Sequence, residues 1–152
     1  MRAPIKEIFC SVQGEGPYVG VRQVFVQFEG CNLSCNYCDT LEAKKSSQKC
    51  RVEVTPGKRD FMELKNPVDN KKLETVVERY GKVHSVSLTG GEPLLHPDFI
   101  RELNVSAPLY LETNMTLPGE AVGVKNCVRY IAGDFKLSDA LGESIIYEEI
   151  RE

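Results

Sequence analysis

The chain has 152 residues, of which 41% are hydrophobic and 27% are charged, and its formal net charge is −3. This length favours one domain with a real hydrophobic core, and the ordinary composition argues against disordered, fibrous and membrane classes. The acidic balance disfavours a groove for a nucleic-acid backbone. Because no apolar run suggests a membrane span or an export signal, we expect a cytoplasmic protein.

Strand-like segments and glycine-rich turns alternate in the first third of the chain. Residues 21–29 alternate between apolar and polar side chains, which predicts a strand with one buried face. A second strand is expected over 5–10, and the intervening run at 13–17 holds too many structure breakers for a regular element. Residues 41–68 are rich in lysine and turn formers, so we expect a surface insertion there with at most short strands, around 51–54.

From residue 69 onward, helical and strand patterns alternate. Asp69 is a suitable N-cap, and apolar residues at helical spacing lead from it to Gly81, which predicts an amphipathic helix with a glycine stop. The remaining elements are expected as a strand over 83–88, a short helix over 97–103, strands over 109–112, 127–131 and 134–137, and the start of a helix over 145–152. This order predicts an α/β domain with a largely parallel sheet.

Three of the six cysteines, Cys31, Cys35 and Cys38, lie close together in the loop after the strand expected over 21–29. Their spacing lets three thiolates converge on one metal centre. A zinc site would need a fourth ligand, which Cys50 or Asp39 could supply. A 4Fe–4S cluster normally takes four cysteines, so three would leave one iron open to another ligand. Unligated thiols are the third interpretation.

The CxxxCxxC spacing, with an aromatic residue before the last cysteine, resembles the radical S-adenosylmethionine (radical SAM) superfamily, in which SAM occupies the open iron. The run Thr89-Gly-Gly-Glu-Pro93 is similar to the superfamily's SAM-binding motif, where glycines let the backbone approach the ligand. Gln-Gly-Glu-Gly at 13–16, Asp-Thr at 39–40 and Leu-Glu-Thr-Asn at 111–114 narrow the resemblance to the 7-carboxy-7-deazaguanine synthase family. It covers nearly the whole chain except 41–68.

This resemblance implies a single radical SAM core domain over 1–152, folded as a partial (β/α) barrel and truncated at its C-terminus relative to the family. Its members are carbon–nitrogen lyases that convert 6-carboxy-5,6,7,8-tetrahydropterin to 7-carboxy-7-deazaguanine, for queuosine or archaeosine in tRNA. The implied cofactors are the 4Fe–4S cluster, SAM and Mg²⁺. The implied partners are the pterin, a flavodoxin- or ferredoxin-type reductant and a second copy of the chain, with no nucleic acid and no membrane.

The resemblance also assigns roles to matching positions. The cluster ligands would be Cys31, Cys35 and Cys38, and Mg²⁺ would be bound by Thr40. The SAM contacts would be Tyr37, Cys38, Asp39, Gly91, Asp134 and Lys136. The pterin contacts would be Val12, Gln13, Gly14, Glu15, Gln27 and Thr89. Structural alternatives are packing for Tyr37, a helix N-cap for Thr40, a solvated turn for Gln13 and Glu15, and a surface ion pair for Asp134 with Lys136.

Gln27 is a departure from the family, whose members typically carry an arginine there that meets the substrate carboxylate. Glutamine cannot form the charged, bidentate contact, so the resemblance implies weaker binding unless Arg22 or another cation substitutes. Lysines 44, 45 and 49 are interpreted as a solvated face, with docking of an acidic electron donor as the alternative. The remaining cysteines are expected as buried or partly buried thiols at Cys10, Cys50 and Cys127.

Two other functions remain open. The activases of anaerobic ribonucleotide reductase, which act on glycyl-radical enzymes, share the cysteine spacing and are about this short. The Gln-Gly-Glu-Gly run at 13–16 and the Asp-Thr pair at 39–40 argue against them. A non-catalytic zinc-binding module is the alternative outside radical chemistry.

Overall fold

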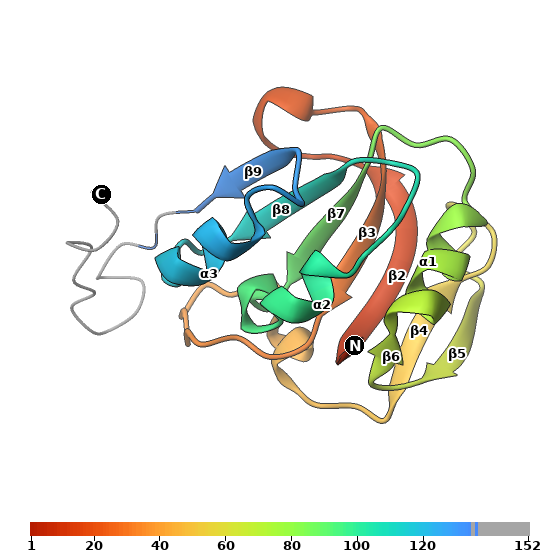
Figure 1. The fold of residues 1–152 in the computed structure, drawn as a ribbon. Coiled ribbons are helices and arrows are strands. Elements are labelled where there is room, and N and C mark those ends of the chain that lie inside the picture. Colours follow the sequence, from red (N-terminus) through yellow and green to blue (C-terminus); the bar gives the residue numbers. More distant parts are fainter. Residues whose placement is uncertain (135, 137–152) are drawn as a thin grey trace.

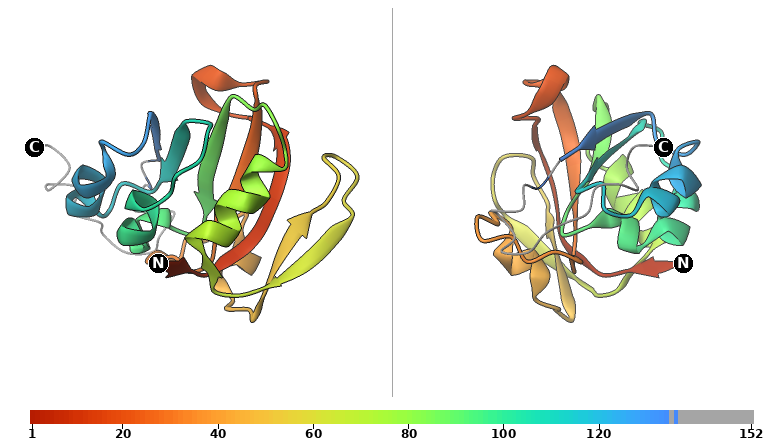
Figure 2. Two further views of the ribbon diagram at one scale, coloured as in Figure 1. Left: turned by 45° about the vertical axis from the view of Figure 1, so that its right-hand side comes forward. Right: turned by 90° about the vertical axis from the view of Figure 1, so that its left-hand side faces the viewer.

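The computed structural model describes residues 1–134 and 136, which build a curved sheet with helices against one of its faces (Figures 1 and 2). The seven strands of this sheet are, in spatial order, β5 (Phe61–Lys65), β4 (Lys49–Glu53), β2 (Ile5–Val12), β3 (Arg22–Phe28), β7 (Ser85–Gly90), β8 (Leu109–Thr113) and β9 (Tyr130–Gly133). A separate pair is formed by β1 (Arg2–Ala3) and β6 (Val68–Asp69). The helices are α1 (Asn70–Glu78), α2 (Pro97–Arg101) and α3 (Pro118–Val124), and the 3-10 turns are η1 (Gly16–Tyr18), η2 (Leu41–Lys44) and η3 (Pro93–Leu95).

The sheet is largely parallel, which confirms the predicted fold class. Strands β3, β7, β8 and β9 run parallel to one another, and β4 runs parallel to β2. Only the pairs β2–β3 and β4–β5 are antiparallel in the described sheet. Because parallel strands end at the same edge, the loops after β3, β7, β8 and β9 are brought together there.

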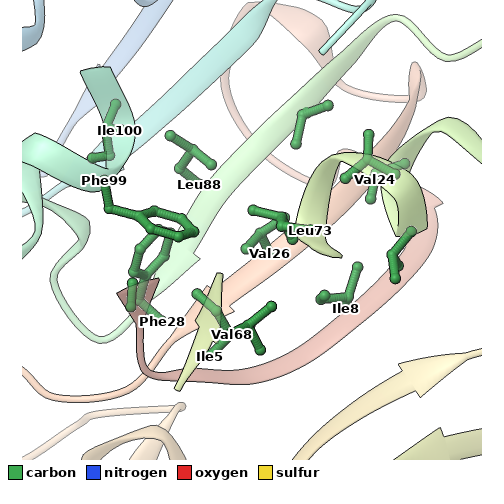
Figure 3. Packing of buried hydrophobic residues seen from close by; sticks show 14 of the residues in the cluster. Ile5, Ile8, Val24, Val26, Phe28, Val68, Leu73, Leu88, Phe99 and Ile100 are labelled. Carbon is green, nitrogen blue, oxygen red and sulfur yellow. The ribbon is translucent and has the colours of Figure 1, made fainter. Parts of the chain in front are cut away.

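The core lies between the sheet and the helices (Figure 3). Val24, Val26 and Phe28 on one face of β3 are fully buried, and Leu73 of α1 and Phe99 of α2 pack into the same cluster. The rings of Phe28 and Phe99 meet edge to face, with their centroids 5.9 Å apart. Burial of each such side chain contributes about 1.5–3 kcal/mol, so the alternating pattern of β3 fixes which face meets the helices.

Helix α1 begins and ends for the reasons expected from its sequence. The side chain of Asp69 accepts a hydrogen bond from Lys72 N at 2.9 Å, which confirms it as the N-cap. After the helix, Gly81 adopts a left-handed φ of +69°, a conformation that glycine takes without steric cost.

Residues 41–68 differ from the expected surface insertion, because β4 and β5 extend the central sheet. Cys50 is 0% and Val52 1% exposed, so β4 contributes side chains to the core. Five-residue strands are too short for their alternation to stand out among lysines and turn residues.

The strand expected over 127–131 begins only at Tyr130, and Cys127 lies exposed before it. That corrects the expectation of a buried or partly buried thiol at Cys127. Helix α3 was not expected, because its two glycines obscure a helical pattern. The expected strand over 134–137 falls largely outside the described residues, and the expected helix over 145–152 falls entirely outside them. Within the described part, none of the helices has the length and apolar character needed to cross a bilayer.

Candidate functional site

A cavity of about 1160 Å³ lies against the face of the sheet that is turned away from the helices. Alternation along β3 explains this arrangement, because Phe25 lines the cavity while its neighbours Val24 and Val26 belong to the core. Phe9 of β2 stacks on Phe25 at 5.2 Å and forms part of the same wall. The volume exceeds that of a usual single-ligand pocket, so there is room for more than one bound molecule.

All three loop cysteines line this cavity. Cys31, Cys35 and Cys38 are free, partly exposed thiols. A hydrogen bond from Cys38 N to Cys35 O closes a turn within their loop. Leu33 N donates to Cys31 Sγ at 3.4 Å, and Asn114 Nδ2 lies 3.9 Å from the same sulfur. Burial raises the pKa of the Cys31 thiol above its ordinary value. The hydrogen bond from Leu33 N opposes this rise.

The two metal centres that the cysteine spacing leaves open require different distances between the sulfurs. No three His, Cys, Asp or Glu side chains in the described part of the chain are grouped closely enough to hold one metal ion. Tetrahedral zinc with bonds of about 2.3 Å to sulfur needs its sulfurs about 3.8 Å apart. A 4Fe–4S cluster bound by three cysteines places each sulfur on a different iron, so the thiols surround it at wider spacing.

The glycine pair Gly90-Gly91 at the end of β7 allows two strand ends to meet without side chains between them. Gly91 N donates to Phe28 O at 2.9 Å, and Glu92 N donates to Gly30 O at 2.8 Å. A Cβ atom on Gly91 would lie 1.8 Å from Gly30 O, and Gly90 has a φ of +99°. The loop that carries the three cysteines (residues 31–38, the cluster loop) and the loop at residues 90–92 (the glycine loop) are therefore held side by side at the cavity.

Glu92 ties this glycine loop to the end of β8. It is fully buried, and its carboxylate accepts hydrogen bonds from Leu94 N, Thr113 Oγ1 and Asn114 N at 2.8–2.9 Å. Burial raises the pKa of this carboxyl above its ordinary value, while the three donors oppose the rise. Since Glu92 does not line the cavity, its role is to position the loops around it.

A polar array on the cavity wall is centred on Glu112 of β8, to which the sequence analysis gave no role. Gln13 Nε2 and Ser87 Oγ donate to Glu112 Oε1 at 2.9 and 2.8 Å, and Thr89 Oγ1 donates to Oε2 at 2.6 Å. A charged residue within the apolar strand Leu109–Thr113 was the feature that could have identified it.

Gln13 also shapes the turn that follows β2. Its side chain is buried, and its Oε1 accepts from Gly14 N at 2.8 Å and Glu15 N at 3.1 Å. Gln13 is therefore fixed from both ends instead of belonging to a solvated turn, and it places Glu15 on the cavity wall. Val12 stands at the rim, where its side chain is 60% exposed.

Most of the other predicted site residues also lie around the cavity. Tyr37, Asp39 and Gly91 line it, and so do Asp134 and Lys136, which form an ion pair. The ammonium of Lys136 also lies 5.3 Å from the centroid of the Tyr37 ring. The expected pair is thus part of the cavity wall and links the end of β9 to the cluster loop.

Thr40 follows the cluster loop at the position before η2. It does not cap that turn with its side chain; instead its Oγ1 donates to Gly90 O at 3.1 Å and lies 3.7 Å from Cys38 Sγ. The hydroxyl keeps lone pairs for a further ligand. Its place on the cavity wall fits a hard cation that takes oxygen ligands.

The structure places Gln27 and Arg22 differently relative to the cavity. Gln27 alternates with Val26 and Phe28 along β3, so it shares the face of Phe25, and it pairs in the sheet register with Thr89, which lines the cavity. Arg22, the suggested substitute, donates instead to the carbonyls of Tyr80 and Lys82 at 3.1 and 3.0 Å. Its guanidinium is thereby held near the start of β3, whereas the cluster loop follows the end of that strand.

The expected lysine face is split by the structure. Lys45 and Lys49 are exposed and form ion pairs with Glu42 and Glu63. Lys44 is partly buried and lines the cavity, because η2 turns it inward. A solvated face therefore describes only two of these lysines.

Comparisons with known proteins agree with this geometry. Residues 26–134 match the family model described as the radical SAM superfamily. A 7-carboxy-7-deazaguanine synthase from Archaeoglobus fulgidus is 49% identical over 92% of this chain and 58% of its own length. The enzyme of that name from Geobacter sulfurreducens is 42% identical over 99% of this chain and 63% of its own length.

Among solved structures, a crystal structure of QueE from Escherichia coli is similar with a TM-score of 0.54 and 27% identity. The match covers 76% of this chain and 54% of that one. It supports the expected partial radical SAM fold. The chain thus spans between half and two thirds of the length of these relatives.

Proposed function

The chain belongs to the radical SAM superfamily, and on that premise we propose that it converts 6-carboxy-5,6,7,8-tetrahydropterin to 7-carboxy-7-deazaguanine, with ring contraction and loss of ammonia. The product would serve the formation of queuosine or archaeosine in tRNA. One observation carries the proposal: the three loop thiols and the polar array around Glu112 line the same cavity. The likeness to synthases named for this product supports it.

Cys31, Cys35 and Cys38 would hold a 4Fe–4S cluster. When bound, this group supplies the electron that cleaves SAM into methionine and a 5′-deoxyadenosyl radical. Gly91 N–H is already used by Phe28 O, so the Gly91 carbonyl is the backbone group left to accept from the SAM ammonium. The remaining SAM contacts would come from other residues of the same wall, namely Tyr37, Cys38, Asp39, Asp134 and Lys136.

The polar array would bind the pyrimidine edge of the pterin. That edge presents N–H donors beside a carbonyl acceptor, which suits a carboxylate flanked by an amide and a hydroxyl. Glu112 would accept from the ring N–H groups, with Gln13 and Thr89 holding its two oxygens in place. Val12, Gly14, Glu15 and Gln27 would complete the contact.

The proposal also includes Mg²⁺ and two partners. Thr40 Oγ1 would give Mg²⁺ one oxygen ligand, since this ion keeps most of its sites for water and substrate oxygens. A flavodoxin- or ferredoxin-type protein would supply the electron, and a second copy of the chain would form a homodimer. Six free cysteines suit a reducing compartment, so we place the activity in the cytoplasm.

The test uses the chain loaded with iron and sulfide under anaerobic conditions. We expect a brown protein whose electron paramagnetic resonance spectrum, after reduction, changes when SAM is added. With the carboxylated pterin present, mass spectrometry should detect the deazapurine. A colourless protein holding one zinc ion would contradict the proposal. SAM cleavage that the pterin leaves unchanged would favour an activase.

Glu112 provides the matched variant for this test. Glu112→Gln should keep the SAM-dependent spectral change but lose most deazapurine formation, because one carboxylate oxygen becomes an N–H donor facing other donors. Glu120→Gln changes an exposed carboxylate on α3 and should behave as the unmodified chain. Equal deazapurine formation by the two variants would show that Glu112 does not bind the substrate.

A further inference from the structure

The cavity wall is poor in positive charge. The acidic residues that line it, within the described part of the chain, are Glu15, Asp39, Glu112 and Asp134. The basic residues that line it there are Lys44 and Lys136. The substrate of the proposed function is a carboxylate, and apart from the Mg²⁺ proposed at Thr40 its charge can be compensated only by a cationic side chain of this wall.

Lys136 already has partners. Its ammonium is paired with the Asp134 carboxylate and faces the Tyr37 ring at 5.3 Å. The pair carries no net charge, so Lys136 offers an incoming anion less attraction than an unpaired cation would.

Lys44 is the other cation, and its place is fixed by the backbone around it. It ends η2, in which the buried Ala43 accepts a hydrogen bond from Gly30 N and donates one to Thr40 O. The first bond, at 2.9 Å, anchors the turn to the end of β3 beside the cluster loop, and the second, at 2.8 Å, closes the turn itself. Among the described residues, the Lys44 ammonium makes no hydrogen bond or ion pair.

Backbone donors nearby do not compete for an anion. Gly91 N and Glu92 N, at the same corner of the cavity, are used by the carbonyls of Phe28 and Gly30. Lys44 and Cys31 line the same cavity, and η2 holds Lys44 beside the end of β3, from which the cluster loop starts.

Glu29 is a rival partner for Lys44. Its carboxylate is 3% exposed, Oε2 accepts from Ser47 N at 3.1 Å, and Oε1 has no hydrogen-bond partner among the described residues. Both residues line a second hollow of about 250 Å³ behind the cluster loop. Lys44 thus stands at the boundary between the two hollows, and the two roles predict different effects of its removal.

We propose that the Lys44 ammonium binds the carboxylate of the pterin substrate and so sets the preference for a carboxylated ligand. The proposal rests on the proposed function and gives Lys44 the role that the sequence analysis considered for Gln27 or Arg22. A flexible lysine reaches the anion as a point charge and needs no bidentate geometry.

The experiment measures equilibrium binding to the anaerobic, cluster-loaded chain in the presence of SAM. The ligands are 6-carboxy-5,6,7,8-tetrahydropterin and tetrahydropterin, which lacks the carboxylate. We expect Lys44→Ala to raise the Kd of the carboxylated ligand about ten- to a hundredfold and to leave the Kd of the other ligand within about twofold. Lys44→Arg should restore most of the difference, and Lys45→Ala, an exposed neighbour, should change neither value.

Four results would overturn the assignment of Lys44. They are equal weakening of both pterins, weakening of SAM binding instead, unchanged binding of all ligands, and a loss of thermal stability in Lys44→Ala with pterin affinity kept. The last result would show that Lys44 is a structural partner of the Glu29 carboxylate and does not bind the substrate. If the unmodified chain binds SAM but neither pterin, the proposed function fails, and the assignment fails with it.

Discussion

The thiols of this chain differ because their surroundings differ. Burial raises the pKa of Cys50 to about 12, and it also raises that of Cys10, which lies on the buried side of β2. Cys127 is exposed after α3, and the three loop cysteines are partly exposed on the cavity wall. Since the thiolate is the reactive form, exposure and pKa together decide which thiols react.

Alkylation of the folded chain at pH 8 tests this difference. In the cluster-loaded protein, iodoacetamide should modify Cys127 first, because the loop cysteines are held by iron. After removal of the cluster, iodoacetamide should also modify Cys31, Cys35 and Cys38. Cys10 and Cys50 should react only after denaturation. Peptide mass spectrometry gives the order, and early modification of Cys50 would contradict its burial.

At the scale of elements, the site depends on backbone hydrogen bonds between the loops and strand ends that surround the cavity. The glycine loop after β7 and the end of β3 exchange backbone hydrogen bonds, and η2 is bound to the same strand end through Ala43. Glu92 then joins the glycine loop to β8. The wall is therefore built from elements that lie far apart in the sequence.

Gly91→Ala tests this assembly. The added Cβ atom would lie 1.8 Å from Gly30 O, so the two loops must separate and break the bonds between them. We expect a loss of about 2–4 kcal/mol in the free energy of unfolding, together with weaker cluster retention.

The matched control is Gly119→Ala on α3. Nothing lies within 4 Å of a Cβ atom at Gly119, so this change should stabilise the helix by up to about 1 kcal/mol. Urea unfolding measures both variants. Equal stability of Gly91→Ala and the unmodified chain would show that the loops tolerate separation.

At the scale of the whole molecule, His96 couples folding to pH. The residue lies between the core and the second hollow, where its ring stacks on Phe28 with centroids 5.8 Å apart. Burial lowers the pKa of this imidazole below 6.5, although the neighbouring Glu29 backbone opposes the shift.

The resulting pH dependence has a definite sign. The unfolded chain binds a proton at His96 at higher pH than the folded chain does, so stability rises with pH through that window. We expect the free energy of unfolding to fall as the pH drops below about 6.5. The decrease should be smaller in His96→Gln and intact in His84→Gln. Identical pH profiles for the unmodified chain and His96→Gln would contradict this.

Features that depend on local spacing could be predicted from the order of the residues alone. Three cysteines within eight positions must share a loop, and the Asp69 cap with its following apolar residues is sufficient to define α1. Alternation in β3 likewise determines which of its side chains can be buried together. These features were predictable because their physical causes act between residues that are close in the chain.

The set of distant residues that share the cavity, in contrast, follows from the folded arrangement of the strands. Gln13 and Glu112 are 99 positions apart and meet through the order of the parallel strands, which no local pattern encodes. The same holds for Lys44, which belongs to a lysine-rich stretch but is turned inward where η2 joins the end of β3. Strand order and loop packing arise from the burial of the whole core, so the partners of these polar side chains follow from the fold.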